Sequence, residues 1–566
     1  MKKAIEFCLI FFLSSVFAHS AAAKLLTSAE ERQYAAYTKY DDVTGFLSRL
    51  QAMDSRLKVY VVGKTLENAS ENRLGRDLLC CAVSDPKHTG DKILVQVQAS
   101  HHGNEQSGVD AIQQLLIGIV EKKLDFLLER MDLVIFPQVN PYGNENNVRV
   151  NEQGLDMNRD HSKLEAAETE ALHRVFSALY PEVTFDMHEK GDAYYKINVG
   201  TVTNLNIDPR IGEYSHRVIL PGAFKEAGAT PAHEYLIQTT MDDLPSSGAV
   251  PEGLTNPSEE IFRFSTTDIN DGRNSFGIFN TFSFIQEIAG NGDIDQYRDR
   301  SRWAFEGLTA FLKTIYANSR EIKALTAQCR ADLVRKARSV DPKNLVQLRT
   351  IYAHDPLQPV LKLKTYAKEE AGVFATAAHD IKAGQPLSRS DLVRSGRTPR
   401  VVETEIANWF PRLDSLVTCV RPLGYVVPGK RGDVIALLLK LGVKVYSFDQ
   451  GGVLAVEACQ VDDVIQGTED YIPPQRIKVS LHQLQLPVQR GDCYIPLAQL
   501  AANLVPLLLE PQSDLGLIRF RSFNLGVEKG DIFPIYRVLQ SPQLPFTALG
   551  DFRSLQAVSL GLKPRI

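Results

Sequence analysis

A histidine and a glutamate stand three residues apart in the segment Ser100-His101-His102-Gly103-Asn104-Glu105. The segment directly follows an apolar run that indicates a buried strand, so we place it in a strand-to-helix loop. A turn that contains glycine can aim the imidazole of His102 and the carboxylate of Glu105 at one point. Zn²⁺ accepts both donors, and catalytic zinc commonly takes two histidines, one glutamate and a water. Taken alone, the pair also fits a plain polar loop.

A second polar segment follows the next apolar run. It contains Asn140-Pro141-Tyr142-Gly143, then Arg149-Val150-Asn151, then Gly154-Leu155-Asp156-Met157-Asn158-Arg159. So compact a loop with two arginines suits an anionic group, because arginine can grip a carboxylate through two parallel hydrogen bonds. The alternative interpretation is a surface loop that is rich in turn residues.

Two further strand ends carry ionisable side chains. Asp186 and His188 end one predicted strand and point to the same side of it, because side chains alternate along a strand. A carboxylate beside a ligand histidine would hold its tautomer and raise its basicity. A histidine in this position also fits a packed or solvated residue. Glu287 ends a later strand, where a lone acid also serves as a cap or a salt-bridge partner.

Strands alternate with helices around these segments. The predicted strands are Lys92–Gln98, Met131–Val139, Glu182–Met187 and Phe279–Ile288, and the predicted helices are Thr44–Met53, Asp110–Arg130 and Thr169–Leu179. This alternation predicts an α/β fold with a mixed, largely parallel twisted sheet that is covered by helices on both faces. Ligands of such sheets collect at the carboxyl ends of the strands, where all four polar segments lie.

In this order and placement, the four segments together resemble the zinc carboxypeptidases of the carboxypeptidase A type. The resemblance runs from Val97 to Gly290. It implies the zinc carboxypeptidase fold, one zinc ion per chain, and a peptide or peptide-like substrate with a free C-terminal carboxylate. Three segments nearer the C-terminus resemble the tail of large bacterial secreted members of the family, namely Arg421–Pro428, Gly491–Pro496 and Leu509–Asp514.

The resemblance also implies a role for each residue of the site. The zinc ligands would be His102, Glu105 and His188, with Asp156 orienting the first ligand histidine, Arg149 stabilising the oxyanion, Asn158 and Arg159 binding the terminal carboxylate, and Glu287 acting as the general base. Asp186 joins this set as the carboxylate beside His188.

The chain departs from the family pattern at the tyrosine that closes over the substrate. Phe276 stands in the expected neighbourhood, and Tyr235 and Tyr214 are distant candidates. The segment Leu236–Asn274 is either a flexible surface loop or a loop that gates the substrate.

The length of 566 residues predicts at least two domains, because single cores stop growing near about 250–300 residues. We expect a catalytic domain over residues 24–320 and a mixed α/β accessory domain over residues 321–566. The predicted elements of the second domain are the helices Ser319–Ala337, Val434–Leu441 and Leu497–Leu509 and the strands Leu345–Tyr352, Val360–Tyr366 and Val373–Ala377. The net charge of −5, with no dense run of Lys or Arg, argues against nucleic acid as a partner.

Residues 1–23 have a basic start, a short apolar run and small residues at two possible cleavage positions, a pattern typical of a secretory signal. We therefore expect a secreted or periplasmic protein without stable membrane insertion after cleavage. The alternative is an uncleaved membrane anchor. Export permits disulfides among the six cysteines that follow the signal, with no pairing indicated by the sequence.

The leading hypothesis is a zinc metallocarboxypeptidase that removes C-terminal residues from peptides. Two related alternatives use the same site: an enzyme that acts on cell-wall stem peptides, and an N-acyl-amino-acid deacylase. An alternative of another class is a zinc- or peptide-binding protein without catalysis. The last is disfavoured because the ligands, the base and both arginines are all present.

Overall fold

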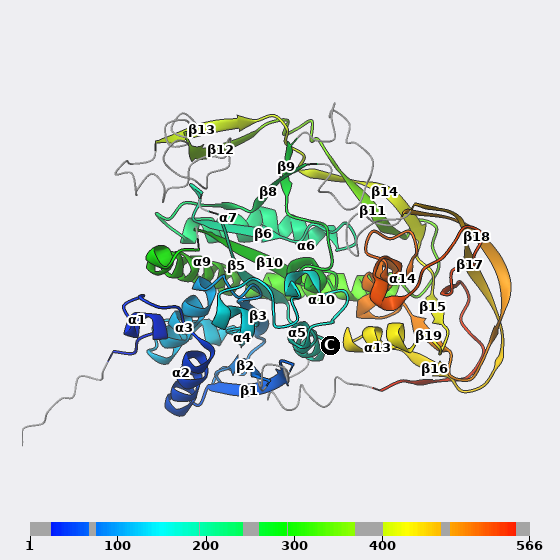
Figure 1. Cartoon of the computed structure of the whole chain (residues 1–566), viewed down its shortest axis with the longest axis horizontal. Coiled ribbons are helices and arrows are strands. Elements are labelled where there is room, and N and C mark those ends of the chain that lie inside the picture. The colour runs from blue at the N-terminus through cyan, green and yellow to red at the C-terminus, as the bar shows by residue number, and fades with distance from the viewer. Residues whose placement is uncertain are drawn as a thin grey trace, which may run out of the picture.

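The computed structural model describes residues 24–66, 75–191, 193–240, 260–290, 292–367, 400–465 and 476–550. An eight-stranded sheet forms the centre of the first part of the chain, in the strand order β1-β2-β4-β3-β5-β10-β6-β7 (Figure 1). The strands are β1 (Leu57–Lys64), β2 (Asp77–Val83), β3 (Ile93–Ala99), β4 (Met131–Phe136), β5 (Val183–Lys190), β6 (Ile197–Thr201), β7 (Ala232–Glu234) and β10 (Phe282–Ala289).

The centre of the sheet is parallel. Strands β4, β3, β5 and β10 all run in the same direction, whereas the pairs β1–β2, β2–β4 and β10–β6 are antiparallel. Every residue of β3 and of β10 is buried, as expected of strands with both faces covered. The predicted α/β fold with a mixed, largely parallel sheet is therefore confirmed.

Helices cover both faces of the sheet. Helix α9 lies on one face, where Phe311 stacks on Phe185 of β5 with ring centroids 4.1 Å apart, and α3 packs against α9. Helix α8 lies on the opposite face, where Gly272 touches Asp186 of the same strand. The helices of the first part are α1 (Ser28–Glu31), α2 (Tyr40–Met53), α3 (Ser107–Val120), α4 (Pro141–Asn146), α5 (Ala167–Leu179), α6 (Pro209–Tyr214), α7 (Leu220–Glu226), α8 (Gly272–Gly277), α9 (Tyr297–Ala317) and α10 (Ser319–Lys336).

Two predicted helices are shorter than expected. Helix α3 ends at Val120, and the chain then continues into a separate 3₁₀ turn, η2 (Asp125–Glu129). Lys122 adopts a left-handed φ of 62°, and the next two backbone N–H groups bond back to Gly118, which closes the helix. The predicted helix Leu497–Leu509 divides into η7 (Leu500–Ala502) and α14 (Leu504–Leu509). Pro506 has no N–H to bond back to an earlier turn, so α14 can begin only just before it.

The segment Leu236–Asn274 contains a strand pair in its described part. Strands β8 (Leu236–Thr240) and β9 (Glu260–Phe264) are antiparallel neighbours. Phe262 of β9 donates its backbone N–H to Asn408 over 2.7 Å and accepts from Phe410 over 2.8 Å. This strand pair is therefore bound to the C-terminal part of the chain.

The C-terminal part is rich in sheet. A seven-stranded sheet has the order β18-β17-β20-β15-β19-β16-β21, and two further pairs are β11–β14 and β12–β13. The elements are β11 (Leu345–Ala353), β12 (Leu361–Tyr366), β13 (Val401–Ile406), β14 (Arg412–Val420), β15 (Gly424–Val427), α13 (Gly432–Lys440), β16 (Tyr446–Phe448), β17 (Gly452–Ile465), β18 (Arg476–Val488), β19 (Cys493–Pro496), α14, β20 (Tyr536–Val538) and β21 (Phe546–Ala548).

The two parts of the chain share a hydrophobic core. One cluster of buried apolar side chains runs from Val43 to Ile535, and α13 packs on α5. Lys440 of α13 forms an ion pair with Glu170 of α5 over 2.7 Å. The C-terminal part is thus packed firmly against the sheet that carries the polar segments.

Some predictions fall outside the described residues, namely the signal in residues 1–23 and the strand Val373–Ala377. In the described ranges, no helix is long and apolar enough to cross a membrane. The six cysteines of these ranges, Cys80, Cys81, Cys329, Cys419, Cys459 and Cys493, are all free thiols.

Candidate metal centre and active site

Two loops meet closely at the carboxyl ends of β3 and β4. Ser100 takes a left-handed φ of 62° where the chain leaves β3. A Cβ at Gly103 would lie 1.9 Å from the backbone of Gly143, so only glycine lets the loops approach this far. The side chain of Asn140 locks the arrangement, because it accepts from the Gly143 N–H over 2.8 Å and donates to the carbonyl of His101.

The side chains of His102, Glu105 and His188 converge at this edge of the sheet. The Nδ1 atom of His102 lies 2.8 Å from one carboxylate oxygen of Glu105, and Nδ1 of His188 lies 2.8 Å from the other. The two Nδ1 atoms are 3.2 Å apart. The three residues each offer a ligand atom, and these atoms all lie within 4.8 Å of one another. Two histidines and one glutamate are a donor set that catalytic zinc uses.

Both histidines meet a second carboxylate through Nε2. Nε2 of His102 lies 3.2 Å from Asp156, and Nε2 of His188 lies 3.0 Å from Asp186. Burial opposes charge on these rings, but the carboxylates outweigh it and raise the pKa of both histidines. If both nitrogens of each ring carried a proton to make these contacts, both rings would be imidazolium ions. Their Nδ1 atoms would then face each other at 3.2 Å. A divalent cation in place of the two Nδ1 protons removes this conflict and leaves each Nε2–H to its carboxylate, so the residues fit zinc.

Strand β10 brings Glu287 beside His188. The two residues are partners in the parallel pairing of β10 with β5, so their side chains leave the sheet on the same face. Glu287 is 7% exposed, and its Oε2 atom has no hydrogen-bond partner within the described part of the chain. Burial raises the pKa of Glu287 to about 7, although the charge of His188 opposes the rise. An acid with a pKa near neutrality can exchange a proton with water beside the metal ligands.

Arg149 and Asp156 form the more open side of the site. Nη2 of Arg149 donates to Asp156 over 2.8 Å, and Nη1 lies 3.9 Å from Glu105. The side chain of Arg149 is 46% exposed, so its guanidinium reaches solvent next to the ligands. Burial would raise the pKa of Asp156, but His102 and Arg149 hold it well below its usual range.

Asn158 and Arg159 follow Asp156 on a short 3₁₀ turn, η3 (Met157–Arg159). Asp156 caps this turn by accepting the Asn158 N–H over 3.0 Å. The side-chain oxygen of Asn158 accepts from the backbone N–H of Gly272 over 2.7 Å, and Arg159 donates to the Asn158 carbonyl over 2.7 Å. The turn that carries both residues is thereby tied to α8 and to Asp156, the carboxylate that contacts His102.

Comparison with known proteins identifies the family. Residues 43–188 match the sequence profile of the family described as zinc carboxypeptidase. "Carboxypeptidase 2" of Trichophyton tonsurans is 25% identical over 537 residues, which cover 88% of this chain and 86% of that protein. "Carboxypeptidase 2" of Trichophyton rubrum is 24% identical over 534 residues, with coverage of 88% and 86%. Over residues 43–188 the chain is therefore similar to the zinc carboxypeptidase family.

Solved structures of this family resemble part of the chain. A metallo-carboxypeptidase from Burkholderia cenocepacia is 18% identical, covers 50% of this chain and 70% of its own, and has a TM-score of 0.38. A metallo-carboxypeptidase from Pseudomonas aeruginosa, in complex with (2-guanidinoethylmercapto)succinic acid, is 15% identical, covers 51% and 71%, and has a TM-score of 0.37. The resemblance to zinc carboxypeptidases expected from the four segments is confirmed at the level of the family.

The three candidates for the tyrosine of the zinc carboxypeptidases lie in different places. Phe276 is fully buried in an aromatic cluster of the core. Tyr214 packs edge-on against Phe282 at the amino-terminal end of β10, away from the ligands. Tyr235 directly follows β7. Burial raises the pKa of Tyr235 most, and the negative charge of Glu287 raises it further. The Nζ atom of Lys190 on β5 lies 5.5 Å from the centre of the Tyr235 ring, so of the three Tyr235 is the residue near the site.

Two residues of the candidate site, Lys190 and His101, were not predicted from the sequence. Lys190 lies two positions after His188 on β5. Burial lowers the pKa of Lys190 to about 8, although the negative charge of Glu287 opposes this shift. The two-residue period of a strand could have indicated it. His101 contacts Asp186 over 2.9 Å, and the doubled histidine before Gly103 was the available signal.

Proposed function

We propose that this protein is a secreted zinc metallocarboxypeptidase that removes C-terminal residues from peptides. The proposal depends on one observation, the convergence of His102, Glu105 and His188 with their ligand atoms within 4.8 Å of one another. These residues come from β5 and from the loop after β3, and a packed core holds them together. The family of the chain supports the same assignment.

Each residue of the site has a step that its position supports. When bound, Zn²⁺ supplies a Lewis acid, which lowers the pKa of water towards neutrality and polarises a carbonyl group. Glu287 takes a proton from the attacking water and returns it to the leaving amine. Arg149 is exposed beside Glu105 and stabilises the negative charge that develops on the carbonyl oxygen.

The substrate is a peptide with a free C-terminal carboxylate. Asn158 uses its side-chain oxygen to accept from Gly272, which leaves its amide nitrogen as a donor for a ligand. Arg159 follows directly and carries the positive charge that a carboxylate requires. The pair is tied to the metal ligands through Asp156, which contacts His102 over 3.2 Å. The cleaved bond would therefore lie one residue from the carboxylate.

Export and domain organisation are part of the proposal. The pattern of residues 1–23 supports a cleaved signal and a secreted or periplasmic location. Residues 24–320 form the catalytic domain, and residues 321–566 form an accessory domain that braces the sheet. The contact of β9 with Asn408 and Phe410 supports a further role for this domain in holding the segment that precedes α8.

The test is digestion of a synthetic peptide library by the purified mature protein, with mass spectrometry of the products. We expect loss of single C-terminal residues, abolished by a chelator and restored by zinc. Glu287→Gln should retain zinc and lose activity, because the amide cannot accept the proton.

Other outcomes would contradict the proposal or narrow it. Cleavage of an N-acylated amino acid with intact peptides would indicate a deacylase. Cleavage restricted to cell-wall stem peptides would narrow the substrate to that class. Absence of bound zinc in the wild-type protein, or peptide cleavage that is unaffected by Glu287→Gln, would remove the assignment altogether.

A further inference from the structure

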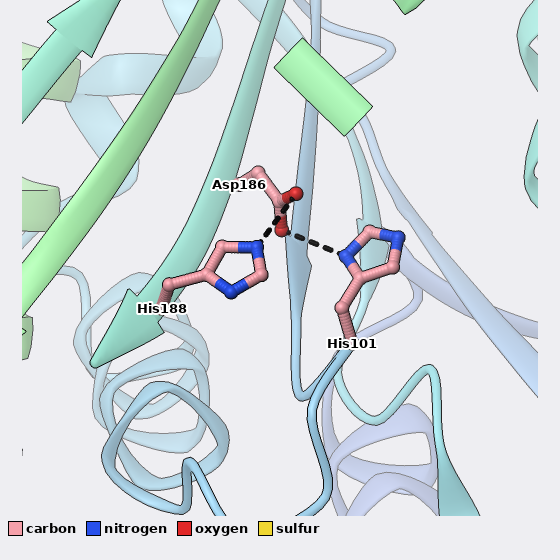
Figure 2. A group of neighbouring side chains, drawn as sticks. All are labelled: His101, Asp186 and His188. Atoms are coloured by element: carbon pink, nitrogen blue, oxygen red, sulfur yellow. Dashed lines mark hydrogen bonds and ion pairs between the residues drawn. The ribbon is translucent and has the colours of Figure 1, made fainter. Parts of the chain in front are cut away.

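His188 is the first member of a chain of polar side chains that are buried away from water. Figure 2 shows Asp186 between the rings of His188 and His101, with a contact to each. One oxygen of Asp186 lies 3.0 Å from Nε2 of His188, and the other lies 2.9 Å from Nδ1 of His101. The two rings are nearly parallel, at an interplanar angle of 8°. Asp186 is 2% exposed and His101 is 0% exposed, so no bulk water competes for the carboxylate.

The chain extends beyond His101 to two further histidines. Nε2 of His101 lies 3.3 Å from Nε2 of His161, and Nδ1 of His161 lies 2.9 Å from Nε2 of His173. His161 follows the turn that carries Arg159, and His173 belongs to α5. The chain therefore joins strand β5, the loop after β3, the arginine-bearing turn and a helix on one face of the sheet.

A single arrangement of protons assigns one proton-bearing side to every contact in this chain of polar side chains. If Nδ1 of His188 is a metal ligand, its Nε2 carries the hydrogen and faces Oδ2 of Asp186 at the ion-pair distance of 3.0 Å. Nδ1 of His101 then donates to the other oxygen of Asp186, and Nε2 of His101 accepts from His161. Nδ1 of His161 accepts in turn from His173. Burial lowers the pKa of both His161 and His173, which agrees with neutral rings at this end of the arrangement.

The space around Asp186 is closed on the side of α8. A Cβ at Gly272 would lie 2.7 Å from Oδ2 of Asp186 and 3.3 Å from Nε2 of His161. The carboxylate consequently has little room to turn, and the hydrogen bond from His101 determines which way its second oxygen points. Among the described residues, His101 is the only hydrogen-bond donor to this oxygen, Oδ1 of Asp186.

We propose that His101 is a positioning residue of the metal centre, which orients Asp186 and through it the ring of the ligand His188. The inference rests on the proposed function, because it requires a metal at His102, Glu105 and His188. His101 touches no reacting atom. It acts by keeping Nε2 of His188 as the hydrogen-bearing nitrogen and by increasing the basicity of Nδ1, the effect that a fixed carboxylate has on a ligand histidine.

The same three residues could instead hold a second metal ion, since His101, Asp186 and His188 also offer clustered ligand atoms. The contacts favour the hydrogen-bonded reading. Nδ1 of His101 already has an acceptor in one oxygen of Asp186, and Nε2 of His188 lies 3.0 Å from the other oxygen as an ion pair. In the first cluster, by contrast, two ring nitrogens face each other at 3.2 Å. We therefore expect one zinc ion per chain.

Two amide substitutions at His101 test the proposal. In His101→Asn the amide nitrogen takes the place of Nδ1 and can still donate to Asp186, whereas in His101→Gln the amide reaches the place of Nε2 and faces His161. Zinc affinity is measured by competition with a chelator on the full mature chain, and the visible spectrum of the Co²⁺-substituted protein reports ligand geometry. His216→Asn is the matched control, because His216 also contacts a carboxylate, at 3.0 Å from Glu234, but not a metal ligand.

We expect His101→Gln to bind zinc about 10- to 100-fold more weakly than wild type, with an altered Co²⁺ spectrum, whereas His101→Asn stays within about threefold. In His101→Gln, kcat should fall and KM should change little, because the substrate contacts remain. Equal zinc affinity and equal spectra for wild type, His101→Asn and His101→Gln would overturn the proposal. Two zinc ions per wild-type chain would also overturn it. A wild-type protein without zinc would instead defeat the proposed function itself, so the two failures are distinguishable.

Discussion

The two histidines proposed as zinc ligands, His102 and His188, are held by two carboxylates in different surroundings. Asp186 lies on β5, is 2% exposed and is fixed by the buried His101. Asp156 lies on a loop, its side chain is 25% exposed, and it shares its oxygens between His102 and the half-exposed Arg149. We refer to Asp186, His188 and Glu287 as the strand half of the site, and to Arg149 and Asp156 as the loop half.

The difference separates two tasks within one site. The strand half is rigid because paired strands and a packed core surround it, so it suits a metal ligand and a base that must stay in place. The loop half combines charge with access to solvent, so it suits groups that must meet the substrate. Substitutions in the two halves should therefore change different measured quantities.

The largest effect is expected from the base in the strand half. Glu287→Gln should lower kcat on the order of 10²- to 10⁴-fold, because the amide cannot accept a proton from water. Zinc content should remain that of wild type. Steady-state kinetics and elemental analysis of the same preparation check this, and a loss of zinc along with activity would reassign Glu287 to metal binding.

The loop half should respond next most strongly. Arg149→Met should lower kcat on the order of 10²-fold or more, because one group that stabilises the oxyanion is lost. Zinc affinity should stay close to wild type, since Arg149 does not touch either ligand histidine. Arg149→Lys should recover part of the rate by restoring the charge. If Arg149→Met instead weakens zinc binding as much as it slows turnover, the division between the halves is wrong.

The two carboxylates provide the direct comparison. Asp186→Asn should weaken zinc binding about 10- to 100-fold, because the buried amide cannot accept from both histidines at once. Asp156→Asn should weaken it less, since water can reach that site and replace part of the lost contact. Chelator competition on both variants measures the difference. An equal or reversed order would mean that burial does not decide the strength of these contacts.

The smallest effect concerns the stability of the folded protein and comes from Glu168 of α5, outside both halves of the site. Burial raises the pKa of Glu168 to about 7, with the charge of Glu152 acting in the same direction, and its Oε2 accepts from Asn151 over 3.3 Å. The folded protein therefore binds this proton more tightly than the unfolded chain, and stability falls as the pH rises from about 4.5 to about 7. Glu168→Gln should remove that loss and raise stability above pH 7 by about 1–3 kcal/mol.

Thermal unfolding of wild type and Glu168→Gln across this pH range checks the effect. The two curves should approach each other at low pH, where both side chains are neutral. A constant offset between the curves at all pH values would show that the carboxylate has an ordinary pKa in the folded protein.

Much of the fold follows from local patterns in the chain. The four central strands contain runs of buried apolar residues, and helices with an apolar stripe lie between them, so the order of elements was predictable. Helix ends were less so. The left-handed Lys122 and the proline at position 506 end or divide predicted helices through backbone geometry rather than hydrophobic period. The candidate ligands His102, Glu105 and His188 were predicted from the resemblance of the four polar segments, taken together, to zinc carboxypeptidases, since each segment alone also fits a plain polar loop or strand end.

The sequence by itself determined which residues could bind a metal, because residue type and the period of a strand are local properties. Only the tertiary structure decided that Asp186 turns one oxygen to His188 and the other to His101. It also decided that His161 and His173 extend this row of contacts. Finally, it decided that Tyr235 rather than Tyr214 lies near Glu287. These contacts join residues far apart in the chain, and their existence depends on how the sheet, its helices and the loops pack. No local pattern encodes such packing, since the same side chains would fit equally well on a solvated surface.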